Sequence, residues 1–217
     1  ITDSAPVPRR NVVSLERCND CHQKLSLHGN NRTDNTELCA TCHNPNATDI
    51  NRRVAGSACV AALGADDAPI DLKYMIHALH AGARANYSVC GFGNEPHDYS
   101  AVRYPGKLDN CLGCHRDDTY YPAHDLSRLA TSFDAGPDRR TAADDIAVSP
   151  ATTACLGCHS GSLATAHMRQ NGGSFEIRKS AEGSTAVGPI ETCMLCHGPG
   201  RIADVRTVHP GLQPAGP

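Results

Sequence analysis

Residues 18–43 read CNDCHQKLSLHGNNRTDNTELCATCH and contain one five-residue word twice, as CNDCH at 18–22 and CATCH at 39–43. The word returns as CLGCH at 111–115, CLGCH at 155–159 and CMLCH at 193–197. A bare Cys-x-x-Cys pair also suits a redox dithiol or half of a zinc site, but neither needs a histidine at the next position. All five pairs have one, in a chain with only 12 histidines among 217 residues. The word is the attachment signature of c-type haem.

The spacing of the word explains its chemistry. Two thiols three positions apart can bond the two vinyl groups of one porphyrin, and the next histidine reaches the iron from one face. The sequence therefore predicts five c-type haems. The attaching cysteines are Cys18, Cys21, Cys39, Cys42, Cys111, Cys114, Cys155, Cys158, Cys193 and Cys196. The proximal iron ligands are His22, His43, His115, His159 and His197.

The composition leaves room for haem in the interior. The chain has no Trp, three Phe and six Tyr, but 19 Gly and 14 Pro. Ordering so much loop-rich backbone costs conformational entropy that few apolar side chains offset. We therefore expect a multihaem cytochrome c fold that is mainly irregular, with short α-helices, little β structure and the haems as its core. It should form a single pentahaem domain over 1–217, with extended tails at 1–10 and 211–217.

Charge and hydropathy exclude several function classes. A formal net charge of −3 gives no reason to expect nucleic acid as a partner. No stretch approaches the ~20 apolar residues of a membrane-spanning helix. The first ten residues, ITDSAPVPRR, lack the apolar region of a signal peptide.

Seven further histidines are available for the five second axial positions. In the segment IDLKYMIHALHAG, apolar residues recur at helical spacing and Gly82 stops the pattern, which predicts a short helix. His77 and His80 would lie one turn apart and could reach two different haems. His167 lies in SLATAHMRQNGG, a candidate helix capped by Ser162, and His209 follows the candidate short helix RIADVRTV. For each of these four, the alternative is a surface histidine.

His28 raises a separate question, because only six residues separate it from His22. To reach the other face of the same iron, this link would have to wrap around the porphyrin edge. It more easily carries His28 to a neighbouring haem, with Gly29 allowing a close turn. We predict that His28 binds iron, but not the iron of His22.

The remaining candidates rank lower. His97 and His124 lie in loop-like segments, each followed by Asp, which favours a hydrogen-bonding role; both stay alternates for a distal position. Methionine ligation competes weakly. Met194 lies inside a haem word, Met75 occupies a core-like helical position, and Met168 is next to His167.

Cys59 and Cys90 belong to no haem word, and a disulfide between them is the simplest assignment. Closing this loop would contribute about 3.5 kcal/mol in the chain-entropy model. The alternative is two free buried thiols. A disulfide and covalent haem attachment both indicate a compartment outside the reducing cytosol.

The words around the haem motifs resemble the OmcA/MtrC family of outer-surface multihaem c-type cytochromes. The resemblance rests on VPRRNVVSLERCNDCHQKLSLHGNNRTDNTELCATCHNPNATD at 7–49, on DLKYMIHALHAG, on GFGNEPHDYSAVRYPGKLDNCLGCH and on ETCMLCHGPGRIADV. It covers nearly the whole chain, but corresponds to one pentahaem domain alone. It implies that His28, His77, His80, His167 and His209 are the distal ligands, and that the position of His97 tolerates other residues.

The resemblance also implies a function. Such proteins pass respiratory electrons to extracellular acceptors such as metal oxides, soluble shuttles or an electrode. We expect an electron carrier rather than an enzyme, at the outer cell surface or outside the cell rather than in the periplasm. Its partners would be redox proteins or copies of itself, in a larger cytochrome or a filament. The alternative is a multihaem reductase, which would need one haem with an open axial position.

Overall fold

The computed structural model describes residues 10–122, 128–134, 136, 138, 141, 143–179 and 189–212. The tails predicted at 1–10 and 211–217 lie almost wholly outside these residues, and so does His124. Residues 211 and 212 of the second tail belong instead to a 3-10 helix, η5 (Pro210–Leu212). Among the described residues, no helix is long and apolar enough to cross a membrane.

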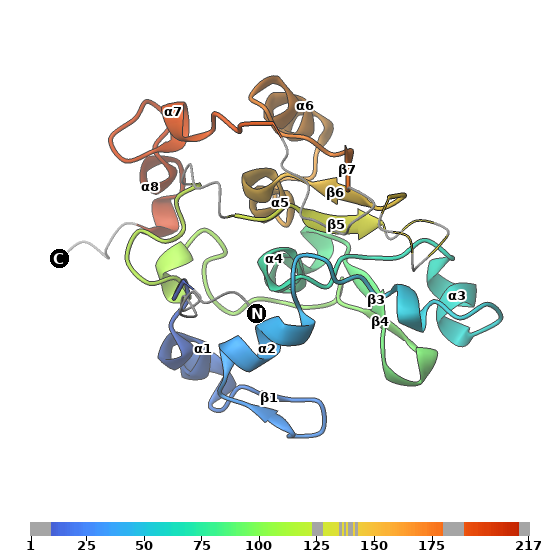
Figure 1. Ribbon diagram of the computed structural model, residues 1–217. Coiled ribbons are helices and arrows are strands. Elements are labelled where there is room, and N and C mark those ends of the chain that lie inside the picture. The colour runs from blue at the N-terminus through green and yellow to red at the C-terminus, as the bar shows by residue number, and fades with distance from the viewer. Residues whose placement is uncertain are drawn as a thin grey trace, which may run out of the picture.

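Short helices supply most of the regular structure (Figure 1). The α-helices of the described residues are α1 (Leu15–His22), α2 (Thr36–Cys42), α3 (Ala58–Leu63), α4 (Leu72–Ala81), α5 (Pro150–Leu156), α6 (Ser162–Gln170), α7 (Met194–His197) and α8 (Val205–Val208). The 3-10 helices besides η5 are η1 (Ile50–Arg52), η2 (Gly82–Arg84), η3 (Phe92–Asn94) and η4 (Cys111–Gly113). Figure 1 shows α4 near the middle of the molecule, with α2 on one side and α5 on the other.

Polar side chains begin several of these helices by accepting a hydrogen bond from the first turn. Ser14 Oγ accepts from the backbone N–H of Arg17 at the start of α1. Asp71 Oδ1 accepts from the N–H of Lys73, 3.3 Å away, at the start of α4. Both residues occupy N-cap positions, where Ser and Asp are favoured because they satisfy otherwise unpaired N–H groups. The helix predicted around His77 and His80 is therefore present as α4.

The starts of α5 and α6 differ. Ser149 is the N-cap of α5 and Pro150 is its first residue, although the hydroxyl of Ser149 makes no capping bond. At α6 the prediction of Ser162 as the cap is wrong by one residue. Gly161 holds the extended backbone of an N-cap, with φ −66° and ψ 155°, and Ser162 is already helical.

The β structure is small, as the sequence predicts. β1 (Ser26–Leu27) pairs with β2 (Arg32–Thr33), and β3 (Ser88–Cys90) pairs with β4 (Pro96–Asp98), both antiparallel. β5 (Thr131–Asp134), β6 (Ile146–Val148) and β7 (Ile177–Arg178) form an antiparallel sheet in that order, with an irregularity between Ser132 and Asp134. These strands are too short, and their sheets too small, to form a layer that could cover a large hydrophobic core.

Buried apolar side chains gather in two small clusters. One contains Ala78, Tyr87 and Val89, and the other contains Ala130, Ala147 and Ile177. Several large apolar side chains are meanwhile exposed, among them Leu163 at 87% and Ile202 at 92%. The polypeptide alone therefore has a smaller hydrophobic core than a chain of this length normally has.

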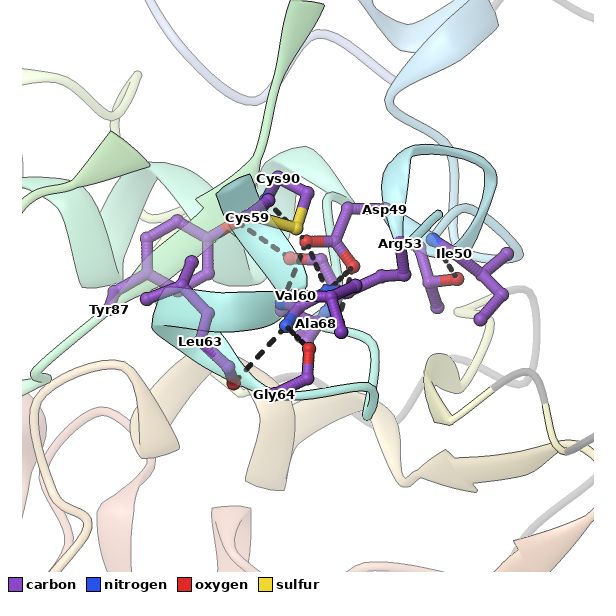
Figure 2. Close-up of polar contacts among 12 residues, drawn as sticks. Asp49, Ile50, Arg53, Cys59, Val60, Leu63, Gly64, Ala68, Tyr87 and Cys90 are labelled. Carbon is purple, nitrogen blue, oxygen red and sulfur yellow. Dashed lines mark hydrogen bonds and ion pairs between the residues drawn. A yellow bond between two sulfur atoms is a disulfide. The ribbon is translucent and has the colours of Figure 1, made fainter. Parts of the chain in front are cut away.

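The disulfide predicted between Cys59 and Cys90 is present and joins α3 to β3, with Cα atoms 5.6 Å apart (Figure 2). A buried ion pair lies beside it, between Asp49 and Arg53, with Nη2 and Oδ2 2.8 Å apart. Asp49 also accepts the backbone N–H of Cys90 at 2.6 Å and that of Ala68 at 2.8 Å. One carboxylate thus ties three separate segments together next to the disulfide.

Candidate haem sites

Every histidine of a Cys-x-x-Cys-His word faces one histidine from outside the words. The ring centres are 6.1 Å apart for His22 and His80, 6.1 Å for His43 and His28, 6.0 Å for His115 and His77, 6.0 Å for His159 and His209, and 5.9 Å for His197 and His167. The five partners are the same five histidines that the sequence favours as distal ligands. No pair among the described residues contains His97.

The spacing of these pairs fits a metal ion held between two imidazoles. An imidazole nitrogen bonds a transition metal at about 2 Å, so two imidazoles on opposite sides of one ion have ring centres roughly 6 Å apart. The described residues contain no group of three His, Cys, Asp or Glu side chains placed to hold a metal ion. Each histidine pair, with the two thiols of its word, is thus a donor set suited to an iron porphyrin.

In four of these histidines, a hydrogen bond from Nδ1 to a backbone carbonyl oxygen determines which ring nitrogen stays free to bind a metal. His43 Nδ1 lies 2.8 Å from the carbonyl oxygen of Ile70, and His80 Nδ1 lies 2.8 Å from that of Ile76. Nδ1 of His197 lies 2.9 Å from the oxygen of Ala203, and Nδ1 of His209 lies 2.9 Å from that of Val205. An Nδ1–H that donates to a carbonyl leaves Nε2 with its lone pair free for a metal.

Burial favours the neutral, metal-binding form of several rings. It lowers the pKa of His77, and burial together with the neighbouring His77 lowers the pKa of His115 to about 4. Burial, reinforced by His209, also lowers the pKa of His159. Because a ligating histidine must be unprotonated, these three rings, which belong to the third and fourth sites, need little proton release to accept a metal.

The ten cysteines of the words are not disulfide-bonded in the structure. Burial raises the pKa of the Cys111 thiol to about 11, and burial with the neighbouring Cys193 raises that of Cys155 to about 12. Reactive dithiols have lowered thiol pKa values. These values argue against a redox-dithiol role for the two words.

His28 reaches its partner through the β1–β2 hairpin that follows α1. Its backbone has φ 53° and that of Gly29 has φ 67°, so the chain reverses within two residues of the left-handed region. The turn brings the ring of His28 beside that of His43 at an interplanar angle of 27°. His22 faces His80 instead. This is the arrangement expected if His28 serves a haem other than that of His22; ligation itself stays a prediction.

The start of α1, the helix that carries the first word, is hydrogen-bonded to the third word. The backbone N–H of Ser14, just before α1, donates to Cys114 O at 2.8 Å. Arg17 Nη1 donates to Leu112 O at 2.9 Å and also to His115 O. α4 then supplies a histidine to each of the two sites, His80 to the first and His77 to the third.

The fourth word lies against the third site. A Cβ added to Gly157, inside the fourth word, would lie 2.7 Å from the Cβ of His77. Only a glycine permits this approach between the fourth word and α4. The remaining pairs are reciprocal, because α6 follows the fourth word and supplies His167 to the fifth, while α8 follows the fifth word and supplies His209 to the fourth.

Two open cavities adjoin these histidines. One of about 550 Å³ is lined by His80, Tyr104 and Arg103, and one of about 570 Å³ by His159 and neighbouring residues. Both volumes lie within the range of about 300–1,000 Å³ that small-molecule sites occupy. Arg84 lines both cavities. No local sequence pattern marks Arg84 or Arg103 as cavity-lining, so neither could be predicted from the sequence.

The lower-ranked candidates have other surroundings. His97 lies exposed on β4, and its ring covers Gly91, where a Cβ would come within 2.2 Å of it. Met75 packs against the cluster around Ala78, in agreement with the core-like position expected for it. His124 lies outside the described residues.

Comparisons with known proteins identify the chain's relatives. A curated protein, the multiheme cytochrome MtrC of Shewanella baltica (strain OS185), is 29% identical over an alignment of 136 residues, and the match covers 54% of this chain and 20% of that protein. The crystal structure of the outer membrane decaheme cytochrome OmcA matches 88% of this chain and 22% of its own, at 27% identity and a TM-score of 0.43. The chain thus spans about a fifth of the length of either protein.

A family model described as "Outer membrane cytochrome MtrC/MtrF-like, domains II/IV" matches residues 10–210. This range includes all five Cys-x-x-Cys-His words and all five histidines that face them. The cytochrome family suggested by the motifs is therefore confirmed, and the location at the outer surface agrees with it. The chain belongs to the outer membrane cytochrome MtrC/MtrF-like family, as a domain of the II/IV type.

Proposed function

We propose that the chain is an electron-transfer module that holds five covalently attached c-type haems, each with two histidine ligands. The observation that carries this proposal is the set of five histidine pairs with ring centres 5.9–6.1 Å apart. When bound, each haem supplies an iron that cycles between ferric and ferrous states. The chain supplies two thioether-forming cysteines and two axial nitrogens per site.

Saturated axial positions favour electron transfer over catalysis. A reductase would need one site whose proximal histidine faces no second ligand, yet all five proximal histidines face one. His97, an alternate for a distal position, is exposed on β4 and belongs to none of the pairs among the described residues. The reductase alternative is therefore not favoured.

The links between sites support an order for electron transfer. The hairpin with His28 connects the first word to the second site, and α4 connects the first site to the third. Gly157 brings the fourth word against His77 of the third site. The reciprocal histidines connect the fourth and fifth sites. The order is therefore second, first, third, fourth, fifth, with the sites of His43 and His197 at the two ends.

The interior and the cavity arginines fit bound haem. The haems would supply the apolar core that the two small clusters do not. Arg84 forms no ion pair with the described residues and lines two cavities, so its guanidinium is placed to bind haem propionates bidentately. Electrons would pass to or from redox partner proteins, and on to extracellular acceptors such as metal oxides, shuttles or an electrode. The module would act within a larger cytochrome or an assembly of copies.

Two measurements on the purified protein test this function. Intact mass and a pyridine haemochrome assay should both give five haems per chain. Carbon monoxide added to the reduced protein should leave the Soret band unchanged, because no iron has an open axial position. A lower haem count would contradict the assignment of the words. A shifted Soret band of substantial amplitude would contradict ligation by two histidines at every site and restore the reductase.

A further inference from the structure

Glu191 lies two residues before the fifth word, yet its carboxylate contacts the start of the helix that carries the fourth. Glu191 Oε1 accepts from the hydroxyl of Ser149, the backbone N–H of Thr152 and the hydroxyl of Thr152, each at 2.7 Å. Glu191 Oε2 accepts from the backbone N–H of Ala151, also at 2.7 Å. One side chain thus takes four hydrogen bonds from α5, about 40 residues away in sequence.

This arrangement replaces the usual local cap of a helix. The N-cap residue Ser149 makes no capping bond of its own: its hydroxyl donates to Glu191 and accepts the backbone N–H of Ser174 at 2.9 Å. The first N–H groups of a helix need acceptors, and an anion is favoured there. Glu191 provides both. The start of α5 is therefore held by a residue of the segment that leads into the fifth word.

The same segment is also tied to the helix that serves the fifth site. The backbone N–H of Thr192 donates to Asn171 O at 2.9 Å, and its hydroxyl donates to the same oxygen at 3.2 Å. Asn171 follows α6, which carries His167. Residues 191 and 192 therefore connect α5, which leads into the fourth word, with α6, which supplies the distal histidine of the fifth.

The charge of Glu191 lies close to the attachment points of both haems. Glu191 is two residues before Cys193 of the fifth word. Its carboxylate accepts the backbone N–H groups of Ala151 and Thr152, which precede Cys155 of the fourth word by four and three residues. The Glu191 carboxylate is therefore placed to act electrostatically on both the fourth and the fifth sites.

We propose that Glu191 is a positioning residue for electron exchange between the fourth and fifth haems, fixing their spacing and lowering the reduction potentials of both. The inference rests on the proposed function and deepens it. A carboxylate near two irons stabilises their ferric states, because oxidation adds positive charge. The four hydrogen bonds keep α5 and the fifth word from moving apart.

Three variants of the haem-loaded protein separate the two effects. Glu191→Gln keeps the length of the side chain and removes its charge. Glu191→Asp keeps the charge but is too short to reach all four donors. Glu176→Gln, at an exposed carboxylate elsewhere on the surface, is the matched control. Redox titrations followed by haem-methyl NMR resonances report each haem separately, and hydrogen exchange reports the amides of residues 151 and 152.

We expect Glu191→Gln to raise the potentials of the fourth and fifth haems, increasing their ferrous-to-ferric ratio at a fixed potential by roughly threefold to tenfold. The other three haems and the Glu176→Gln control should be unchanged. Glu191→Asp should keep both potentials close to those of the unmodified protein, while its amides at 151 and 152 exchange at least tenfold faster. Electron exchange between the two haems, measured by NMR line broadening, should slow in this variant.

Two results would overturn the inference. Unchanged potentials in Glu191→Gln would remove the electrostatic role, and unchanged exchange of the two amides in Glu191→Asp would remove the positioning role. The proposed function has a separate criterion, the haem count of the unmodified protein. A count below five would overturn that function, whereas five haems with unaltered variants would overturn the role of Glu191 alone.

Discussion

His28, the proposed distal ligand opposite His43, lies exposed in the β1–β2 hairpin. It is brought to His43 by two consecutive residues with positive φ, and no other histidine of the described residues is paired with His43. Its removal should therefore leave a single vacant axial position without disturbing the other four pairs. Those pairs take their second histidine from α4, from α6 and from the residue that follows α8.

Replacing His28 with Ala should give one haem in five the ability to bind carbon monoxide. We expect a shifted Soret band in the reduced protein, with an amplitude close to one fifth of that seen when every haem binds the gas. His97→Ala is the matched control and should bind none, because His97 lies exposed on β4. Equal carbon monoxide binding by both variants would show that His28 is not a ligand.

Asp49 has a structural role away from the histidine pairs (Figure 2). Asp49→Asn would remove the negative charge from the buried ion pair with Arg53, in which the two side chains are only 1% and 4% exposed. We expect the free energy of unfolding to fall by about 3 kcal/mol, as is typical when one member of a buried pair is removed. Chemical denaturation measures this change. The exposed carboxyl of Asp66 offers the control Asp66→Asn, which should cost under about 0.5 kcal/mol; a similar loss in both variants would contradict the argument.

At the scale of elements, α4 is the described helix that contributes to the most sites. Its two histidines face two different words, and its residue Ala78 lies in the larger apolar cluster. The fourth word approaches α4 so closely that only glycine fits at the contact. The spacing between the third and fourth sites therefore depends on residue 157 being a glycine, which has no side chain.

Gly157→Ala should disturb this contact. The added Cβ would lie 2.7 Å from the Cβ of His77, so the fourth word or α4 must shift. We expect a loss of about 1–3 kcal/mol in the free energy of unfolding, typical of overpacking, and a changed electron exchange rate between the third and fourth haems. Gly161→Ala is the control, since nothing lies within 4 Å of its added Cβ. An unperturbed Gly157→Ala variant would show that the contact yields without cost.

At the scale of the whole molecule, features encoded by a local motif can be predicted from the sequence, whereas contacts between distant segments cannot. The five-residue word identifies ten cysteines and five histidines, because the haem chemistry fixes their spacing. The short link from His22 to His28 already suggests that they serve different sites. The capping of α5 by Glu191 and the contacts of Asp49 join segments 19 to 41 residues apart. No local pattern records such contacts, so sequence reasoning missed both.

The family and its outer-surface location follow from motifs that cover nearly the whole chain, and the match over residues 10–210 confirms them. The chain spans only about a fifth of two longer relatives. The contribution of this chain is therefore best tested by measuring its own folding and its own redox behaviour. The most informative property is whether the polypeptide has a core without its haems.

A chain produced without covalent haem attachment should not fold cooperatively. Among the described residues, buried apolar side chains pack together in only two clusters of three, and the largest fully buried side chains are mostly polar, such as Thr131, Thr152 and Asp71. We expect it to lack near-UV circular dichroism and a sharp thermal transition. The haem-loaded Cys59→Ala/Cys90→Ala variant is the comparison; it should keep its transition and lose only about 3.5 kcal/mol, because loop closure is its sole loss. A haem-free chain with native near-UV dichroism would show that the polypeptide supplies its own core.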